Sequence, residues 1–148
     1  RQMCIRDRND GRPLEETKES EYSHLGPIVL MDVGDNIGGG STADSTHILK
    51  RAKELKINDY LQSICDPEVV NQCVSAGEGA NISIKVGGKI DEMHGEPIEF
   101  QGTVIKIDDG KYEEHRPNHG GFRFFDDGKR VTQNGSVNIL RGSFHAQG

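Results

Sequence analysis

The sequence predicts a mixed α/β domain in which short units of strand, glycine loop and helix precede a mainly antiparallel sheet. Two observations support this class. Near the start, an apolar run at 28–31 leads into a glycine loop (residues 32–40), and apolar residues at helical spacing follow. From residue 80 onward, apolar and polar residues alternate, which is the period of half-buried strands. Such a sheet either stays open or curls into a barrel-like form, and the sequence leaves both options.

The first unit consists of a short strand, the glycine loop and a helix. The continuous apolar run at 28–31 is typical of a buried strand. Ser41 or Thr42 can cap the helix. Asp44 then lies in its first turn, where its negative charge is attracted to the positive end of the helix dipole. The apolar stripe predicts that this helix continues to about Lys56.

The second unit has the clearest borders. Residues 61–64 are predicted to form a short strand. Asp66 suits the cap of a helix, Pro67 suits its first position, and Gly77 suits the residue that follows its last turn. A helix is therefore predicted over 67–76.

The rest of the chain is predicted to form hairpins, because Asx-Gly and Gly-Gly pairs separate the alternating runs. The predicted turns are at Gly87-Gly88, Asp108-Asp109-Gly110, Asp126-Asp127-Gly128 and Asn134-Gly135. The predicted strands are at 82–86, 98–107, 111–114, 121–125 and 137–140. Together these elements would form the antiparallel part of the sheet.

Composition and charge restrict the class of partner. Hydrophobic residues make up 32% of the chain and glycines number 19, which is enough for one modest core. The net charge of −6, without clusters of Lys or Arg, argues against binding to nucleic acid or to an anionic membrane surface. We find no apolar run of membrane-spanning length and no signal-peptide core, so a cytoplasmic location is expected.

The two ends of the chain depart from this pattern. Residues 1–8 have no helical or strand period and resemble a translated adapter sequence, whereas residues 9–21 resemble a linker or the frayed remains of a helix. We therefore expect a linker-like segment over 1–24 and a domain over 25–148. We also expect this domain to be truncated at its C-terminal end, and a sheet that is cut short favours association into homo-oligomers.

The cysteines and histidines show no recognisable disulfide or metal pattern. The three cysteines are odd in number and lack C-x-x-C spacing, so a small buried side chain is their expected role. His115 and His119 have a helix-like ligand spacing, but a proline and two glycines place them in a loop. His47 follows Asp44 by three residues, which is half of a zinc site, and His94 is isolated. No catalytic residue and no metal ligand is predicted in this chain.

The glycine loop is the main candidate for a binding site. A strand, a glycine loop and a helix start direct backbone N–H groups toward one point, which suits an anion or a developing oxyanion. The loop lacks the Lys of a Walker loop and the spaced glycines of a dinucleotide site, so a nucleotide is disfavoured. Asx residues in turns most often bond to their own backbone, which gives Asp35 and Asn36 a structural alternative.

Five short motifs follow one another along the chain. They are Asp32-x-x-Asp35-Asn36-x-Gly38-Gly39-Gly40, Asp44-Ser45-Thr46, Asp66-Pro67-Glu68, Ala76-Gly77-Glu78-Gly79-Ala80 and Val86-Gly87-Gly88-Lys89. In this order, and over roughly residues 25–135, they resemble the C-terminal domain of the microcystinase C (MlrC) family of metallopeptidases. Two residues depart from the family pattern. Ile37 stands where the family usually has Pro, and Ala43 stands where it usually has Gly.

The resemblance implies a zinc-dependent peptidase whose zinc ligands lie in an N-terminal domain outside this chain. The present domain would form one wall of the substrate cleft, so its implied partners are the N-terminal catalytic domain and a small or cyclic peptide. The implied substrate-binding residues are Asp35, Asn36, Gly38, Gly39, Gly40 and Asp44. The loop would offer its N–H groups to a carboxylate or carbonyl of the peptide.

Two other classes of function stay open. The glycine loop by itself also suits a stand-alone module that binds a phosphorylated or carboxylated small molecule as an anion. A purely structural or oligomerisation domain would use the same glycines only to reverse the chain.

Overall fold

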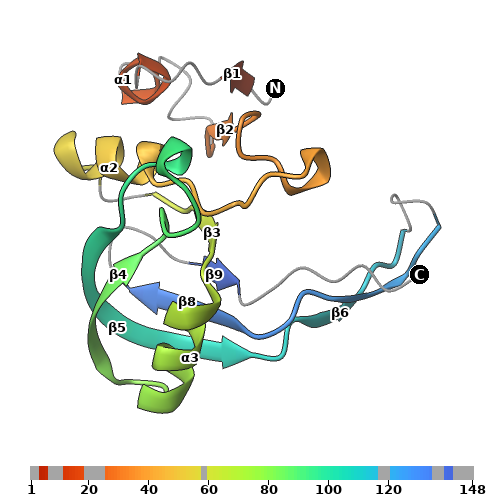
Figure 1. The fold of residues 1–148 in the computed structure, drawn as a ribbon. Coiled ribbons are helices and arrows are strands. Elements are labelled where there is room, and N and C mark those ends of the chain that lie inside the picture. Colours follow the sequence, from red (N-terminus) through yellow and green to blue (C-terminus); the bar gives the residue numbers. More distant parts are fainter. Residues whose placement is uncertain are drawn as a thin grey trace.

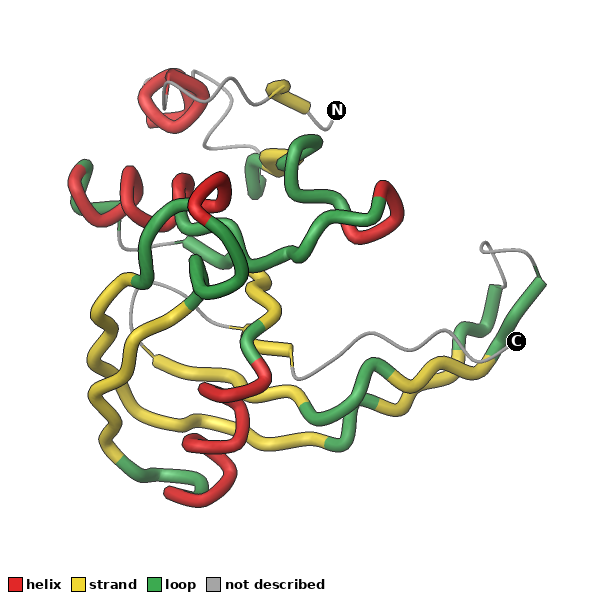
Figure 2. Tube along the Cα trace, in the orientation of Figure 1, coloured by secondary structure: helices red, strands yellow, loops and turns green. Residues whose placement is uncertain are grey.

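A computed structural model shows a sheet with one helix packed on its face and a layer of loops and a second helix at one end (Figure 1). The structure describes residues 4–6, 12–18, 26–57, 60–116, 121–134 and 139–141. A two-stranded ribbon extends away from this body, and the N-terminal elements lie beyond the second helix (Figure 2). The mixed α/β class is therefore confirmed. None of the helices in these ranges is long and apolar enough to cross a membrane.

The central sheet is open and mixed. Its strands, in spatial order, are β3 (Ser63–Cys65), β9 (Ile139–Arg141), β8 (Arg130–Asn134), β5 (Ile98–Asp108) and β4 (Asn81–Val86). β3 and β9 are parallel, and the other neighbouring pairs are antiparallel. Because β3 and β4 form its edges, the described strands do not close into the barrel that the sequence left as an option.

The helix on the sheet, α3 (Pro67–Ala76), has the predicted borders. The Asp66 carboxylate accepts a hydrogen bond from the Val69 N–H at 3.1 Å, and Gly77 ends the helix at a positive φ of 86°. The apolar face of α3 packs against the inward side chains of the strands. The buried core contains Leu49, Ile64, Val69, Val70, Cys73, Ile84, Val86, Phe100, Val104 and Val131. Cys73 is thus the small buried side chain that was predicted.

The helix after the glycine loop, α2 (His47–Glu54), begins later than predicted. The sequence placed its start at Ser41 or Thr42. That placement is wrong because Ala43 adopts a left-handed φ of 57°, which a right-handed helix does not contain. Asp44 therefore lies outside the helix, and it does not share a helix face with the first residue of α2.

The N-terminal part contains one strand that the sequence did not predict and a helix that agrees with one of the two alternatives given for residues 9–21. β1 (Cys4–Arg6) pairs in parallel with β2 (Val29–Met31), and α1 (Arg12–Lys18) lies between them in the chain. The pattern of residues 1–8 gives no sign of β1, because its hydrogen bonds come from pairing with β2, which the residue pattern does not reveal. β2 was predicted to be buried, yet Val29 is 37% exposed. Among the described strands, β2 pairs with β1 alone.

The ribbon consists of β6 (Lys111–Glu113) and β7 (Phe124–Asp126), which pair in an antiparallel manner. The predicted turn before β6 is confirmed, with Gly110 at a φ of 73°. β8 was not predicted as a strand. The predicted turn at Asn134-Gly135 lies partly outside the described residues, and the strand predicted after it is β9.

Candidate functional site

Two loops lie against each other at the end of the sheet, and their contacts define the candidate site. We call residues 32–46 the β2–α2 loop and residues 87–97 the β4–β5 loop. The Gly88 N–H donates to the Asp44 carbonyl at 2.7 Å, and the Thr46 N–H donates to the His94 carbonyl at 2.9 Å. The Thr46 hydroxyl also donates to the Glu96 carbonyl at 2.9 Å. The backbone of one loop is thus fixed to the backbone of the other.

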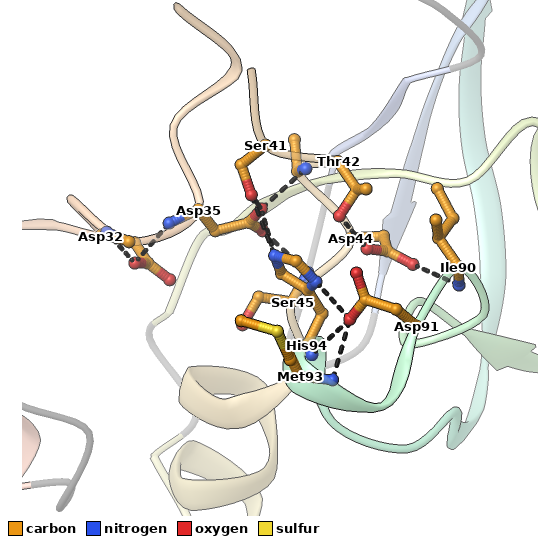
Figure 3. Close-up of polar contacts among 12 residues, drawn as sticks. Asp32, Asp35, Ser41, Thr42, Asp44, Ser45, Ile90, Asp91, Met93 and His94 are labelled. Atoms are coloured by element: carbon orange, nitrogen blue, oxygen red, sulfur yellow. Dashed lines mark hydrogen bonds and ion pairs between the residues drawn. The ribbon is translucent and has the colours of Figure 1, made fainter. Parts of the chain in front are cut away.

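Asp35 organises the β2–α2 loop from within (Figure 3). Its carboxylate accepts hydrogen bonds from the N–H groups of Ala43 and Ser45, both at 2.7 Å, and from the Ser41 hydroxyl at 2.8 Å. Asp35 therefore has a structural role, but through N–H groups eight and ten residues further along the loop and not through the backbone of its own turn. Contact between Asp35 and a substrate stays a prediction.

Asp44 connects the β2–α2 loop to the β4–β5 loop. Its side chain is buried, with 1% of its surface exposed, and its carboxylate accepts hydrogen bonds from the Lys89 N–H at 2.9 Å and the Ile90 N–H at 3.2 Å. The Thr42 hydroxyl donates to the other carboxylate oxygen. Asp44 therefore caps the turn after β4, and its predicted contact with a substrate is untested by this geometry.

The glycines of the loop form a short 3₁₀ turn, η2 (Ile37–Gly39). The Gly39 N–H donates to the Asn36 carbonyl and the Gly40 N–H donates to the Ile37 carbonyl, both at 2.9 Å. These two N–H groups are thus engaged within the loop in this conformation. The turn itself is exposed at Asn36, Gly39 and Gly40, so close approach of a substrate to this backbone stays a prediction.

His94 bridges the two loops, and the expectation that it is isolated is wrong. Its Nε2 lies 2.9 Å from the Ser41 Oγ and 3.5 Å from the Asp35 carboxylate. Its Nδ1 lies 2.7 Å from the carboxylate of Asp91, the residue that caps η3 (Glu92–His94). Figure 3 shows the imidazole between Ser41 on one side and Asp91 on the other. Ser41 and His94 are 53 residues apart in the sequence, so no local pattern could indicate their contact.

The charges around His94 favour its protonated form. The hydrogen bond with Asp91 raises the pKa of His94, and the negative charges of Asp35 and Asp44 act in the same direction. The same hydrogen bond lowers the pKa of Asp91. The spacing Asp91-x-x-His94, with an Asx residue ahead of a short helical turn, is the local signal that could have pointed to this pair.

Ala43 is a strained position in the site. Its φ of 57° is left-handed, and the position is fixed because its N–H donates to Asp35 and its carbonyl accepts from the Cys65 N–H at 2.8 Å. We expect Ala43→Gly to raise the free energy of unfolding by about 0.5–1 kcal/mol, since the relieved strain exceeds the added entropy of the unfolded chain. The urea midpoint measures this change, and an unchanged or lower midpoint would contradict the assignment of strain.

The described residues do not fit a zinc site. Within the ranges given above, no group of three or more His, Cys, Asp or Glu side chains is arranged to hold a metal ion. Asp35 and Asp44 bond to backbone N–H groups, and both ring nitrogens of His94 contact other side chains. His115 is exposed, as expected for a surface loop, and His119 lies outside the described residues. These side chains shape the two loops instead.

Comparisons with known proteins show the family of this chain and two proteins that are similar to it. A family model described as the MlrC C-terminus matches residues 30–147. Microcystinase C from Sphingomonas sp. is 37% identical over 85 residues, which cover 55% of this chain and 16% of that protein. A crystal structure from Mesorhizobium sp. BNC1, described as a "putative metallopeptidase", is similar with a TM-score of 0.75 and 25% identity, over 90% of this chain and 26% of that one. The chain thus spans a small part of both relatives, and by the extent of the family match it belongs to the MlrC C-terminus family.

Proposed function

We propose that this chain is the C-terminal, cleft-forming domain of a zinc-dependent peptidase that hydrolyses small or cyclic peptides. The similarity to microcystinase C and to a structure described as a metallopeptidase supports hydrolysis of a peptide bond. Because this chain spans a small part of both relatives, we assign the zinc ligands and the catalytic groups to the N-terminal domain. A cytoplasmic location and association into homo-oligomers remain predictions.

The observation that carries the cleft role is an exposed turn that is held by hydrogen bonds of the residues on either side of it. Asn36, Gly39 and Gly40 are exposed, whereas Asp35 and Asp44, which precede and follow the turn, accept hydrogen bonds from backbone N–H groups of the two loops. A turn that is fixed at both ends and has three consecutive glycines allows a substrate backbone to approach closely without further ordering of the loop. This arrangement suits one wall of a peptide-binding cleft.

Gly39→Ala tests this role, because the added methyl group has room within the domain itself. Gly39 has no left-handed φ, and the nearest atom to an added Cβ is the Asn36 Cβ at 4.0 Å. In the full-length protein we expect kcat/KM for peptide hydrolysis to fall by at least about tenfold, because the methyl group displaces the substrate. The free energy of unfolding should change by less than about 0.5 kcal/mol.

Gly40→Ala is the matched control for strain. Gly40 has a φ of 88° and nothing within 4 Å of an added Cβ, so alanine there is expected to cost about 1 kcal/mol of stability without a steric overlap. The assay uses linear and cyclic peptides, with zinc removed by a chelator and then restored. Normal kcat/KM for Gly39→Ala would favour a structural domain. Absence of hydrolysis, together with saturable binding of carboxylates or nucleotides in equilibrium dialysis, would favour an anion-binding module.

A further inference from the structure

The side chains of Asp35, Ser41, His94 and Asp91 form a continuous chain of hydrogen bonds between the two loops (Figure 3). The order of Ser41, His94 and Asp91 matches the order of groups in a serine hydrolase triad. In such a triad, the histidine Nε2 must be free of a proton so that it can accept the serine proton. The fourth member, Asp35, decides whether this condition is met.

The direction of each hydrogen bond fixes the protons. Both carboxylate oxygens of Asp35 already accept backbone N–H groups, from Ala43 and from Ser45. The Ser41 hydroxyl donates its single proton to the same carboxylate at 2.8 Å. The Ser41 oxygen can then only accept from His94, so the Nε2 of His94 carries a proton. Ser41 is therefore not activated as a nucleophile.

The other ring nitrogen of His94 is also a donor. The Asp91 oxygen that faces Nδ1 accepts the backbone N–H groups of Met93 and His94, at 2.8 and 3.1 Å. A carboxylate oxygen in this position accepts from Nδ1 as well. With protons on both nitrogens, His94 is an imidazolium ion whose charge lies between the carboxylates of Asp91 and Asp35.

We infer that His94, as an imidazolium ion, is a positioning residue that holds the glycine loop against the β4–β5 loop in the geometry that the substrate requires. The effect of His94 on substrate binding rests on the proposed function. The effect of His94 on the position of the loop does not. If Nε2 loses its proton, neither Ser41 nor His94 has a proton between the two atoms, because the Ser41 hydroxyl donates to Asp35. The hydrogen bond between Ser41 and His94 is then lost. The β2–α2 loop would then be held by fewer contacts with the β4–β5 loop.

The charged groups that face His94 determine whether the loop is held more or less firmly as the pH rises. Asp35 and Asp44 face it from the β2–α2 loop and Asp91 from its own turn, and all three favour the charged ring. From α2, the His47 Nε2 contacts the carbonyl of Met93 at 3.0 Å. The loop should therefore be held wherever the facing carboxylates are ionised and His94 is protonated, and it should loosen as the pH rises through the raised pKa of His94.

The test combines kinetics with hydrogen exchange on the full-length protein. For the wild type, KM should rise as the pH increases through the pKa of His94, while kcat changes little. His94→Gln keeps a donor but no charge, so KM should be about tenfold higher at pH 6 and independent of pH over this range. Asp91→Asn keeps a capping oxygen but removes the charge, and it should move the rise in KM to lower pH. His47→Gln is the matched control and should leave the profile unchanged.

Hydrogen exchange separates this inference from the proposed function. Deuterium uptake of the segment 35–46 should be about tenfold faster in His94→Gln than in the wild type at pH 6, whether or not the loop contacts a peptide. Equal uptake in both proteins, or a wild-type pH profile of KM in His94→Gln, would overturn the positioning role. Faster uptake together with normal kinetics for Gly39→Ala would instead leave the positioning of the loop intact and remove the cleft role.

Discussion

Gly87→Ala is expected to lower the free energy of unfolding by about 3–4 kcal/mol, because left-handed strain and overpacking act together. Gly87 has a φ of 62°, and a Cβ there would lie 2.6 Å from the Asp44 carbonyl oxygen and 2.8 Å from the Thr46 Cγ2. The backbone has little freedom to move away, since the Gly87 N–H donates to the buried Asp66 carboxylate at 2.9 Å. Urea or thermal unfolding of the chain measures the loss.

Gly79→Ala separates the two causes. Gly79 has a φ of 82° and nothing within 4 Å of an added Cβ, so the substitution introduces strain without overlap. Its expected cost is about 1–2 kcal/mol. Equal losses for the two variants would contradict the close packing of the β4–β5 loop against the β2–α2 loop.

Asp44→Ala is expected to cost about 3 kcal/mol. The carboxylate is the acceptor for the N–H groups of Lys89 and Ile90 and for the Thr42 hydroxyl, so its removal leaves several donors without that partner. Each unsatisfied donor near the interior costs about 1–3 kcal/mol, and solvent at the exposed residues 89 and 90 reduces the sum. The measurement is the denaturant midpoint at constant slope.

Asp44→Asn provides the comparison for charge. An asparagine can direct its oxygen to the two N–H groups and its NH₂ to the Thr42 oxygen, so about 1 kcal/mol of loss is expected. If Asn and Ala variants are equally destabilised, the carboxylate does not act through these hydrogen bonds. In the full-length protein, a large fall in kcat/KM with a small loss of stability for Asp44→Asn would support the predicted contact with substrate.

The elements that could be predicted are those whose signals are local. Asp66, Pro67 and Gly77 mark both ends of α3, and the structure has those ends. The positive φ of Gly87 and Gly88 likewise agrees with the predicted turn after β4. Each of these features has a signal in residues within a few positions of one another, so the sequence alone reveals it, although the turn after β4 also bonds to the distant Asp44 and Asp66.

Other elements depend on partners far away in the chain. The Ser and Asp residues ahead of α2 resemble helix caps, but Asp44 binds the β4–β5 loop and Asp35 binds residues 43 and 45. β8 was missed because a polar residue, Gln133, occupies a buried position, where its amide contacts the Cys73 sulfur at 3.1 Å. A side chain of that kind disguises the alternation expected for a strand.

The two departures from the family pattern now have a physical meaning. Ala43 has a φ of 57°, a conformation that Gly adopts freely, which explains why Gly is the usual residue of the resembled family there. Ile37 is the first residue of η2, a position where Pro is also well suited because its φ is already fixed. Both substitutions alter the backbone preferences of the loop, while the side-chain anchors at Asp35 and Asp44 are unchanged.

The separation of the two loops along the chain has a consequence for the order of folding. The contacts of Ser41 with His94, Asp44 with Lys89 and Thr46 with Glu96 span 53, 45 and 50 residues. Closing a segment of this length lowers the chain entropy before the contacts that stabilise the closed form exist. We therefore expect such contacts to form late and to slow the folding of the domain. A partly folded chain would contain every glycine of the loop and yet lack the hydrogen bonds that fix it to the β4–β5 loop, so the candidate site would be completed only at the last stage of folding.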